Sequence, residues 1–414
     1  MYSVGFDSTQ QLLATLRSGR AIRQFAVGIF LTALFCLLLL GPANAQTSFT
    51  TLHTFVGNGD GYNPIGDLVA DSNGALYGVE RPIPASGGVL NQKVFMLTPP
   101  VINGGSWTNK VIYNGVVGAL ILGPHGELYG AGVSTIGSEI FELVPPSTQG
   151  GTWTHQTLYT FQGAAHGDGT GVAFGQLALD AQGNLYGATP SGGFSDTKTA
   201  GTVFELSPPK TVGGAWTETV LYKFSSVGKN PFYQPRVNVV LGPNGELYGT
   251  CTGAVYQLKK QNGVWTPTVI NGVIGKYTSQ LTVDAAGNVF GTDPGYGEVF
   301  EFSPPTVLGG TWTLTLLNFP VQGGIGGDLA LAGGGVLYGN DPYRNVAYKL
   351  TPNGTSWTYT TLHTFLGGSE GLRPAGRPLV DSSGHVFGTT TIGGTGPCNP
   401  HTQYAGCGTV WELQ

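Results

Sequence analysis

The hexapeptide QGNLYG at 182–187 decides the fold, because close variants of it recur along the chain. Each copy joins a polar turn to a short apolar strand that ends in glycine. The other copies are NGALYG at 73–78, HGELYG at 125–130, NGELYG at 244–249, AGNVFG at 286–291, GGVLYG at 334–339 and SGHVFG at 383–388. Their closing glycines lie between 42 residues (Gly249 to Gly291) and 62 residues (Gly187 to Gly249) apart. A repeat of this length is typical of propellers and solenoids.

Each hexapeptide belongs to a longer unit that predicts four short strands. A first strand such as QLALD (176–180) precedes it, and a third strand such as TVFEL (202–206) follows after a variable loop. A turn rich in proline and glycine then leads to a fourth strand that opens with Trp-Thr. The recurring tryptophans are Trp107, Trp153, Trp216, Trp265, Trp312 and Trp357. Their shared repeat position predicts core packing.

The turn before the second strand begins with aspartate in four units and ends with glycine. These aspartates are Asp71, Asp180, Asp284 and Asp381. Aspartate at the start of a turn accepts hydrogen bonds from the backbone of the same turn, which explains the pattern. A calcium loop of the EF-hand type would need further ligands that these turns lack.

Seven units of four strands predict an all-β fold, a seven-bladed β-propeller with four-stranded blades. The last unit, 378–413, has only three strands, whereas TTLHTF at 50–55 duplicates the fourth strand TTLHTF at 360–365. We therefore expect 50–55 to pair with 409–413 and to close the ring. A linear solenoid would need capping repeats, and the sequence contains none.

The first 45 residues have the pattern of a secretory signal peptide. Three arginines precede an apolar run at 26–40, and Ala43-Asn44-Ala45 follows as a small-residue cleavage site. An uncleaved signal anchor is the alternative interpretation. We expect residues 1–45 to be a signal peptide, residues 46–414 to form the repeat domain, and the protein to be secreted, extracellular or periplasmic.

The charge balance argues against a nucleic-acid partner. The chain has 18 basic and 23 acidic residues, and removal of 1–45 would leave 15 basic and 22 acidic residues. Nucleic-acid-binding domains carry a basic patch or stripe instead. We expect a monomer that has no membrane contact after signal cleavage and that binds an extracellular glycan, peptide or protein.

Two cysteines, Cys398 and Cys407, lie in one variable loop. We expect them to form a disulfide, because secretion would place them in an oxidising compartment. A zinc site made of Cys398, His401 and Cys407 is the alternative, although its spacing fits no familiar zinc pattern. Cys251 is expected to be a small buried residue. The sequence predicts no metal site and no cofactor.

The units resemble the GloVer tandem repeats of secreted bacterial proteins. The resemblance rests on the repeated NLYG, GTVFEL and Trp elements, most clearly in GQLALDAQGNLYGATPSGGFSDTKTAGTVFELSPP at 175–209 and in GCGTVWEL at 406–413. It covers most of 47–414 and implies an extracellular β-propeller, without implying an activity. The fourth unit departs from the pattern, because TCTGA at 250–254 replaces the Gly-Gly loop.

The loops between the second and third strands vary most in length. The long ones span 79–92, 188–201 and 389–408. In a propeller these loops share one face with the connections between blades, and variable loops on a rigid frame often carry binding sites. Three of those connections place an acidic residue at a matching position, namely Asp60, Asp168 and Glu370. We expect these three side chains to cap turns.

A polar residue recurs in the first strand, four positions before the turn. The set is Asp67, Gln176, Asn238, Gln280, Asp328 and Arg377, with Ala119 in the remaining unit. In a propeller it would surround the mouth of the central channel, and convergent polar groups in a concave opening are a candidate ligand site. The alternative is that the set satisfies backbone groups of the first strands. Arg377 is expected either to bind a ligand carboxylate or to pair with Asp67 or Asp328.

The sequence assigns no catalytic residue. The motifs HExxH, GxSxG and GxxxxGK[ST] are absent. Three functions stay open: a non-catalytic scaffold that binds a glycan, peptide or protein through its variable-loop face, a lyase or hydrolase with its site at the channel mouth, and a structural protein of the cell envelope. Low charge, at 10% of residues, and the missing motifs favour the first and the third.

Overall fold

The computed structural model describes residues 48–414 apart from 58, 81–91, 103, 135–136, 149, 172–175, 194–198, 212, 226–234, 236–237, 252–253, 272–278, 294, 308, 318, 320–324 and 399–404. The expected signal peptide and its boundary after residue 45 lie outside the described residues. Within the described ranges, no helix has the length and apolar character that a membrane span requires.

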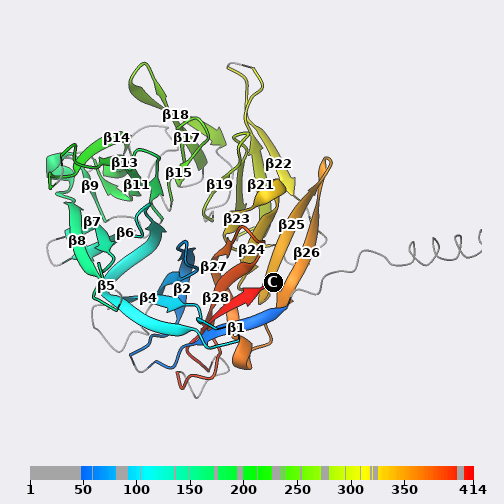
Figure 1. Ribbon diagram of the computed structural model, residues 1–414. Helices are drawn as coiled ribbons and strands as arrows, with labels where there is room; N and C mark the ends of the chain where they lie inside the picture. The colour runs from blue at the N-terminus through cyan, green and yellow to red at the C-terminus, as the bar shows by residue number, and fades with distance from the viewer. Residues whose placement is uncertain are drawn as a thin grey trace, which may run out of the picture. The chain divides into compact units, whose positions relative to one another are not determined.

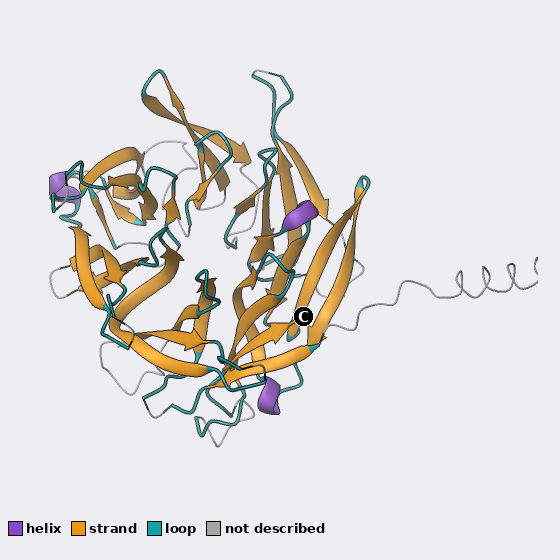
Figure 2. Ribbon diagram, in the orientation of Figure 1, coloured by secondary structure: helices purple, strands orange, loops and turns teal. Residues whose placement is uncertain are grey.

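The described chain is all β, with strands in antiparallel pairs and three single-turn 3₁₀ helices (Figure 2). The helices are η1 (Ala164–His166), η2 (Gly333–Gly335) and η3 (Gly368–Glu370). No sheet in the described part of the chain closes on itself. Figure 1 shows the sheets arranged around a common centre, with β2, β15, β19, β23 and β27 nearest to it.

Five sheets have four strands each, and each sheet contains one sequence unit. Four of them comprise β10 (Ala178–Leu179), β11 (Leu185–Thr189), β13 (Thr199–Ser207) and β14 (Thr217–Ser225); β15 (Val240–Leu241), β16 (Leu247–Cys251), β17 (Ala254–Gln261) and β18 (Val264–Asn271); β19 (Thr282–Val283), β20 (Val289–Asp293), β21 (Glu298–Ser303) and β22 (Thr313–Leu317); and β23 (Leu329–Leu331), β24 (Leu337–Asp341), β25 (Val346–Asn353) and β26 (Ser356–Thr364).

The fifth sheet combines the two ends of the described chain. Its strand order is β1 (Phe49–Thr54), β29 (Thr409–Leu413), β28 (Val386–Ile392) and β27 (Leu372–Val380). Strand β1 pairs with β29 in the register Phe49↔Leu413 to Thr54↔Thr409. The expected pairing of the N-terminal strand with the last strand is therefore present. Strand β27 also lies against β2 of the first unit.

The first two units share one seven-stranded sheet. Its strands are β2 (Pro64–Ala70), β3 (Leu76–Glu80), β4 (Gln92–Thr98), β5 (Thr108–Leu122), β6 (Leu128–Ser134), β7 (Gly137–Val144) and β8 (Thr154–Thr160). The long strand β5 pairs with β4 through its first half and with β6 through its second half, so it serves as the fourth strand of one unit and the first of the next. A small separate pair joins β9 (Gly169–Thr170) to β12 (Ser191–Gly192).

In every unit an aromatic ring of the third strand lies on the glycine of the LYG element. Gly187 pairs with Phe204 across the strands, and a Cβ on Gly187 would come within 2.5 Å of the Phe204 ring. The same contact recurs between Gly130 and Phe141 and, in the last unit, between Gly388 and Trp411. Glycine recurs at this position because the ring occupies the space that any side chain would need.

The recurring tryptophans join neighbouring units, as the sequence predicts for core residues. Four of them pack edge-to-face on the tyrosine or phenylalanine of the preceding unit's LYG element. The pairs are Trp153 on Tyr77, Trp216 on Tyr129, Trp312 on Tyr248 and Trp357 on Phe290, with ring centroids 5.7 to 6.1 Å apart.

Candidate ligand-binding site

The polar set of the first strands links three pairs of neighbouring units. The Arg377 backbone N–H donates to Asp67 Oδ1 at 2.8 Å, and the Gln280 N–H donates to Asp328 Oδ1 at 2.8 Å. The N–H of Gln176 donates in the same way to Asn238 Oδ1 at 2.6 Å. In each case the side chain of one unit accepts from the backbone of the preceding unit.

These strands approach one another closely at a glycine that precedes the polar residue. Gly376 has φ +68°, and a Cβ there would lie 2.3 Å from the carbonyl oxygen of Gly66. A left-handed residue without a side chain is therefore required at this point. The approach places the Arg377 N–H beside the Asp67 carboxylate.

Four members of the set gather into one network, and the other two form a separate pair. The Arg377 guanidinium donates from Nη2 to Gln280 Oε1 at 2.7 Å, and its Nε lies 3.8 Å from Asp67 Oδ2. Burial raises the pKa of Asp67 despite the nearby guanidinium. Burial, with the charge of Asp67, raises the pKa of Asp328 to about 6. These contacts favour the alternative interpretation, in which the polar side chains accept hydrogen bonds from the backbone of the first strands, over ligand binding.

The three acidic residues between units cap turns, as the sequence predicts. Asp60 accepts from the backbone N–H groups of Val56 and Gly57, and Asp168 accepts from that of Gln162. Each also contacts the side chain of the second-last residue in the preceding fourth strand. These contacts are His53 to Asp60 at 3.4 Å, Tyr159 to Asp168 at 2.9 Å and His363 to Glu370 at 3.2 Å.

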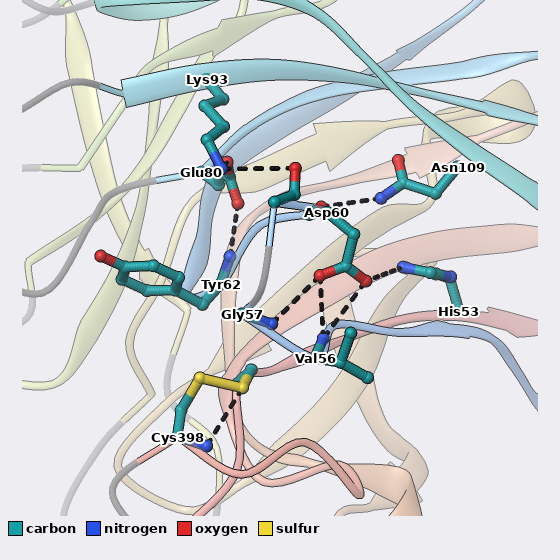
Figure 3. A network of polar contacts seen from close by, with 11 residues as sticks. His53, Val56, Gly57, Asp60, Tyr62, Glu80, Lys93, Asn109 and Cys398 are labelled. Atoms are coloured by element: carbon teal, nitrogen blue, oxygen red, sulfur yellow. Dashed lines mark hydrogen bonds and ion pairs between the residues drawn. A yellow bond between two sulfur atoms is a disulfide. The ribbon is translucent and has the colours of Figure 1, made fainter.

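Figure 3 shows the Asp60 turn beside a buried carboxylate. Glu80 accepts from the Tyr62 N–H and lies 3.4 Å from Lys93 Nζ, and Lys93 also donates to the Gly59 carbonyl. Burial raises the pKa of Glu80 to about 7, although Lys93 and the Tyr62 N–H oppose the shift. The network holds the 57–62 loop in place, which is a structural role.

The same region contains the disulfide, with Cys398 and Cys407 Cα atoms 5.0 Å apart. Bonding of these two sulfurs removes the thiolates that the alternative zinc site would need, and His401 lies outside the described residues. Within the described residues, no group of three or more histidine, cysteine, aspartate or glutamate side chains could hold a metal ion. Cys251 is buried and free, as expected.

A cavity of about 460 Å³ opens between the sixth and seventh units. Its lining residues are Pro342, Tyr343, Asn345, Leu372, Arg373 and Ile392. The first three belong to the turn between β24 and β25, the next two begin β27, and Ile392 ends β28. The cavity is therefore formed by loops between second and third strands and by a connection between units. These two kinds of segment make up the face that the sequence predicts for binding.

The turn beneath this cavity is strongly organised. Asp341 accepts at Oδ1 from the backbone N–H groups of Tyr343 and Arg344, and its Oδ2 lies 3.0 Å from Arg344 Nη1. The Tyr343 side chain is 82% exposed. The hydrogen bonds of Asp341 fix the backbone of this turn, and the Tyr343 ring on it is exposed to solvent. A ligand in the cavity can therefore reach the ring.

Two cavity residues have left-handed backbone conformations although neither is glycine. Asn345 has φ 57° and Arg373 has φ 56°. The Arg373 N–H donates to Asn345 Oδ1 at 2.9 Å, which ties the two units together across the cavity. Sequence reasoning missed both residues. The turn DPYRN at 341–345 is short, whereas the sequence places its variation in length in the long loops.

No family model and no curated protein matches this chain. Solved structures do. A streptogramin B lyase matches with a TM-score of 0.53 and 12% identity, over 88% of this chain and 97% of that chain. A catalytically inactive virginiamycin B lyase from Staphylococcus aureus with quinupristin matches with a TM-score of 0.54 and 13% identity, over 89% of this chain and 99% of that one.

This similarity shows the fold. The chain is an all-β, β-propeller-like protein. At such low identity the shared fold does not transfer an activity. The resemblance to GloVer repeats has no family model behind it.

Proposed function

We propose that the protein is a secreted, non-catalytic, seven-bladed propeller that binds a glycan, peptide or protein partner through its variable-loop face. The observation that carries this proposal is the cavity between the sixth and seventh units. It lies on the face with the variable loops, it has the size of a small-molecule site, and it combines apolar side chains with a few polar groups.

The sheets support seven blades and closure by β1. Five four-stranded sheets contain one unit each, and the seven-stranded sheet contains two more, joined through β5. Strand β27 of the last unit adjoins β2 of the first, and β1 supplies the outer strand that the last unit lacks. The disulfide is compatible with an oxidising compartment and so with secretion.

The chemistry of the lining supports binding rather than catalysis. Among the residues that the structure describes, those lining the cavity are proline, tyrosine, asparagine, leucine, arginine and isoleucine, and none of these has a carboxylate, thiol or imidazole. General acid-base or nucleophilic chemistry ordinarily uses such groups. The arrangement instead offers an exposed ring, a cation and an amide in a concave apolar setting.

Binding of the purified protein to arrays of glycans and peptides tests this proposal. We expect Tyr343→Ala to abolish retention of the ligand that the wild type selects. The matched control is Tyr296→Ala, because Tyr296 is 73% exposed in the equivalent turn of the fifth unit and does not line the cavity. A ligand whose retention is unchanged by Tyr343→Ala would contradict this placement of the site.

A further inference from the structure

We propose that Glu218 is a proton-operated latch: its neutral carboxylic acid keeps the connection at 161–171, between the second and third units, closed, and its ionisation loosens that connection. This inference concerns a different place from the cavity and does not rest on the proposed function. It depends on the position of Glu218 within its unit, on two buried carboxyl oxygens, and on the charges around them.

The first unit shows what a side chain at this position does. Glu218 is the second residue of β14 and pairs with Leu206. Asn109 has the same place in β5, where it pairs with Leu97. The Asn109 amide donates from Nδ2 to the carbonyl oxygen of Asp60 at 2.7 Å. Since Asp60 belongs to the connection that leads into the first unit, this hydrogen bond fastens the connection to the fourth strand.

The third unit has an acid where the first unit has an amide. An amide always carries N–H donors, whereas a carboxyl group can donate only while it is protonated. Within the described part of the chain, Glu218 Oε1 and Asp168 Oδ1 are both buried without a hydrogen-bond partner. Asp168 is 4% exposed, and its other oxygen accepts from Tyr159 and from the Gln162 N–H. Two buried charges without donors are costly, so a proton on Glu218 is favoured.

The groups around Glu218 favour its neutral form. Among the described residues, those whose charge acts on Glu218 are Asp168 in the connection and Lys223 on its own strand, and Glu218 in turn acts on Tyr159 of β8. Burial and the Asp168 charge raise the pKa of Glu218 to about 7, while Lys223 opposes the shift. Above this pH a second negative charge forms beside Asp168, whose carboxylate holds the start of the connection through the Gln162 N–H.

Hydrogen exchange of the full chain, corrected for the intrinsic effect of pH, tests the latch. The closed connection binds the Glu218 proton more tightly than an opened one, so its protection is complete below about pH 4.5 and is lost as the pH rises through 7. We expect peptides from 159–171 to lose about tenfold in protection between pH 6 and pH 8.5. Glu218→Gln, which keeps a neutral donor there, should abolish this loss. Glu80→Gln is the matched control and should not, because Glu80 is a buried carboxyl group of the first unit with a pKa also raised to about 7.

Three results would overturn the latch. The first is wild-type protection at 159–171 that does not change with pH, or a change that survives Glu218→Gln. The second comes from the infrared carbonyl stretch of protonated carboxyl groups, which at pH 6 should be weaker in Glu218→Gln than in the wild type; an unchanged band means that Glu218 is ionised. The third is a calcium-dependent rise of the melting temperature that Glu218→Gln removes, because the two carboxylates then hold a cation in place of a proton.

Discussion

The repeated glycine and the repeated aspartate have different physical reasons. Gly187 recurs because the Phe204 ring lies directly on its Cα, whereas Asp180 recurs because its carboxylate accepts from the N–H groups of Gln182 and Asn184 in the turn. Glycine is needed at position 187 because it leaves room for the ring, and aspartate at position 180 because its carboxylate accepts backbone hydrogen bonds. Substitutions at these positions should therefore fail for different reasons.

Gly187→Ala should destabilise the protein by about 1–3 kcal/mol, because the new methyl group would overlap the Phe204 ring and the Leu177 side chain. Chemical denaturation measures the loss. Gly333→Ala is the control, since a Cβ there meets nothing within 4 Å and the backbone is not left-handed. Comparable losses for the two variants would contradict the packing explanation.

Asp328→Asn should stabilise the protein more at pH 8 than at pH 4. The pKa of Asp328 is raised from 3.8 to about 6, so the folded state holds the proton more tightly than the unfolded chain. The resulting stabilisation is complete below about pH 4 and is lost as the pH rises through 6. Asparagine avoids this loss, and the gain at pH 8 should be about 1–3 kcal/mol.

The hydrogen bond at Asp328 should survive this change. Asn238 already accepts from the Gln176 N–H at the matching position of the fourth unit. Unfolding measured across the pH range therefore isolates the effect of the charge. A difference between variant and wild type that is the same at both pH values would contradict the assignment.

At the scale of the strands, the innermost elements are joined by side chains as well as by backbone approach. β2 and β27 lie side by side, and Arg377 at the centre of β27 contacts Asp67 on β2 and Gln280 before β19. A single guanidinium thus connects three units. The neighbouring carboxylates are buried, so loss of the guanidinium alone would leave an uncompensated buried charge.

Arg377→Ala should lower stability by about 3 kcal/mol, because it leaves the buried Asp67 carboxylate without its cation. The sequence left two roles open for Arg377, a ligand contact or an ion pair with Asp67 or Asp328, and in the first role its loss would affect binding first. Thermal melting of the variant decides between the two roles. An unchanged melting temperature with lost ligand binding would restore the ligand-site interpretation. Arg373→Asn is the control for the melting temperature alone, because Arg373 lies on the same strand in an exposed position.

At the scale of the whole molecule, the first and the last described strands share one sheet. β1 covers the edge of β29, and its Leu52 and the adjoining Phe55 are buried in the core between the first and last units. An uncovered strand edge presents unpaired backbone groups to other chains. The protein should therefore depend on its N-terminal strand for solubility as well as for stability.

Deletion of residues 48–54 should lower the melting temperature and cause aggregation through the exposed edge of β29. Light scattering during refolding measures the aggregation. A synthetic peptide of sequence SFTTLHTF, residues 48–55, should suppress it, whereas a scrambled peptide should not. A truncated chain that stays monomeric and melts like the full chain would contradict closure by β1.

The sequence by itself determined the repeat unit, the order of strands within a unit, the turn-capping roles of Asp60 and Asp180, and the pairing of 50–55 with the last strand. It did not predict that the first two units share the continuous strand β5. All of these depend on local patterns or on duplicated segments, which can be read along the chain. Only the tertiary structure decided the environments of Arg377 and Arg373. Arg377 contacts residues from distant units, and the Arg373 cavity combines two neighbouring sheets through a left-handed backbone. Such contacts depend on how the sheets are placed relative to one another. The order of residues along a single strand does not reveal this placement.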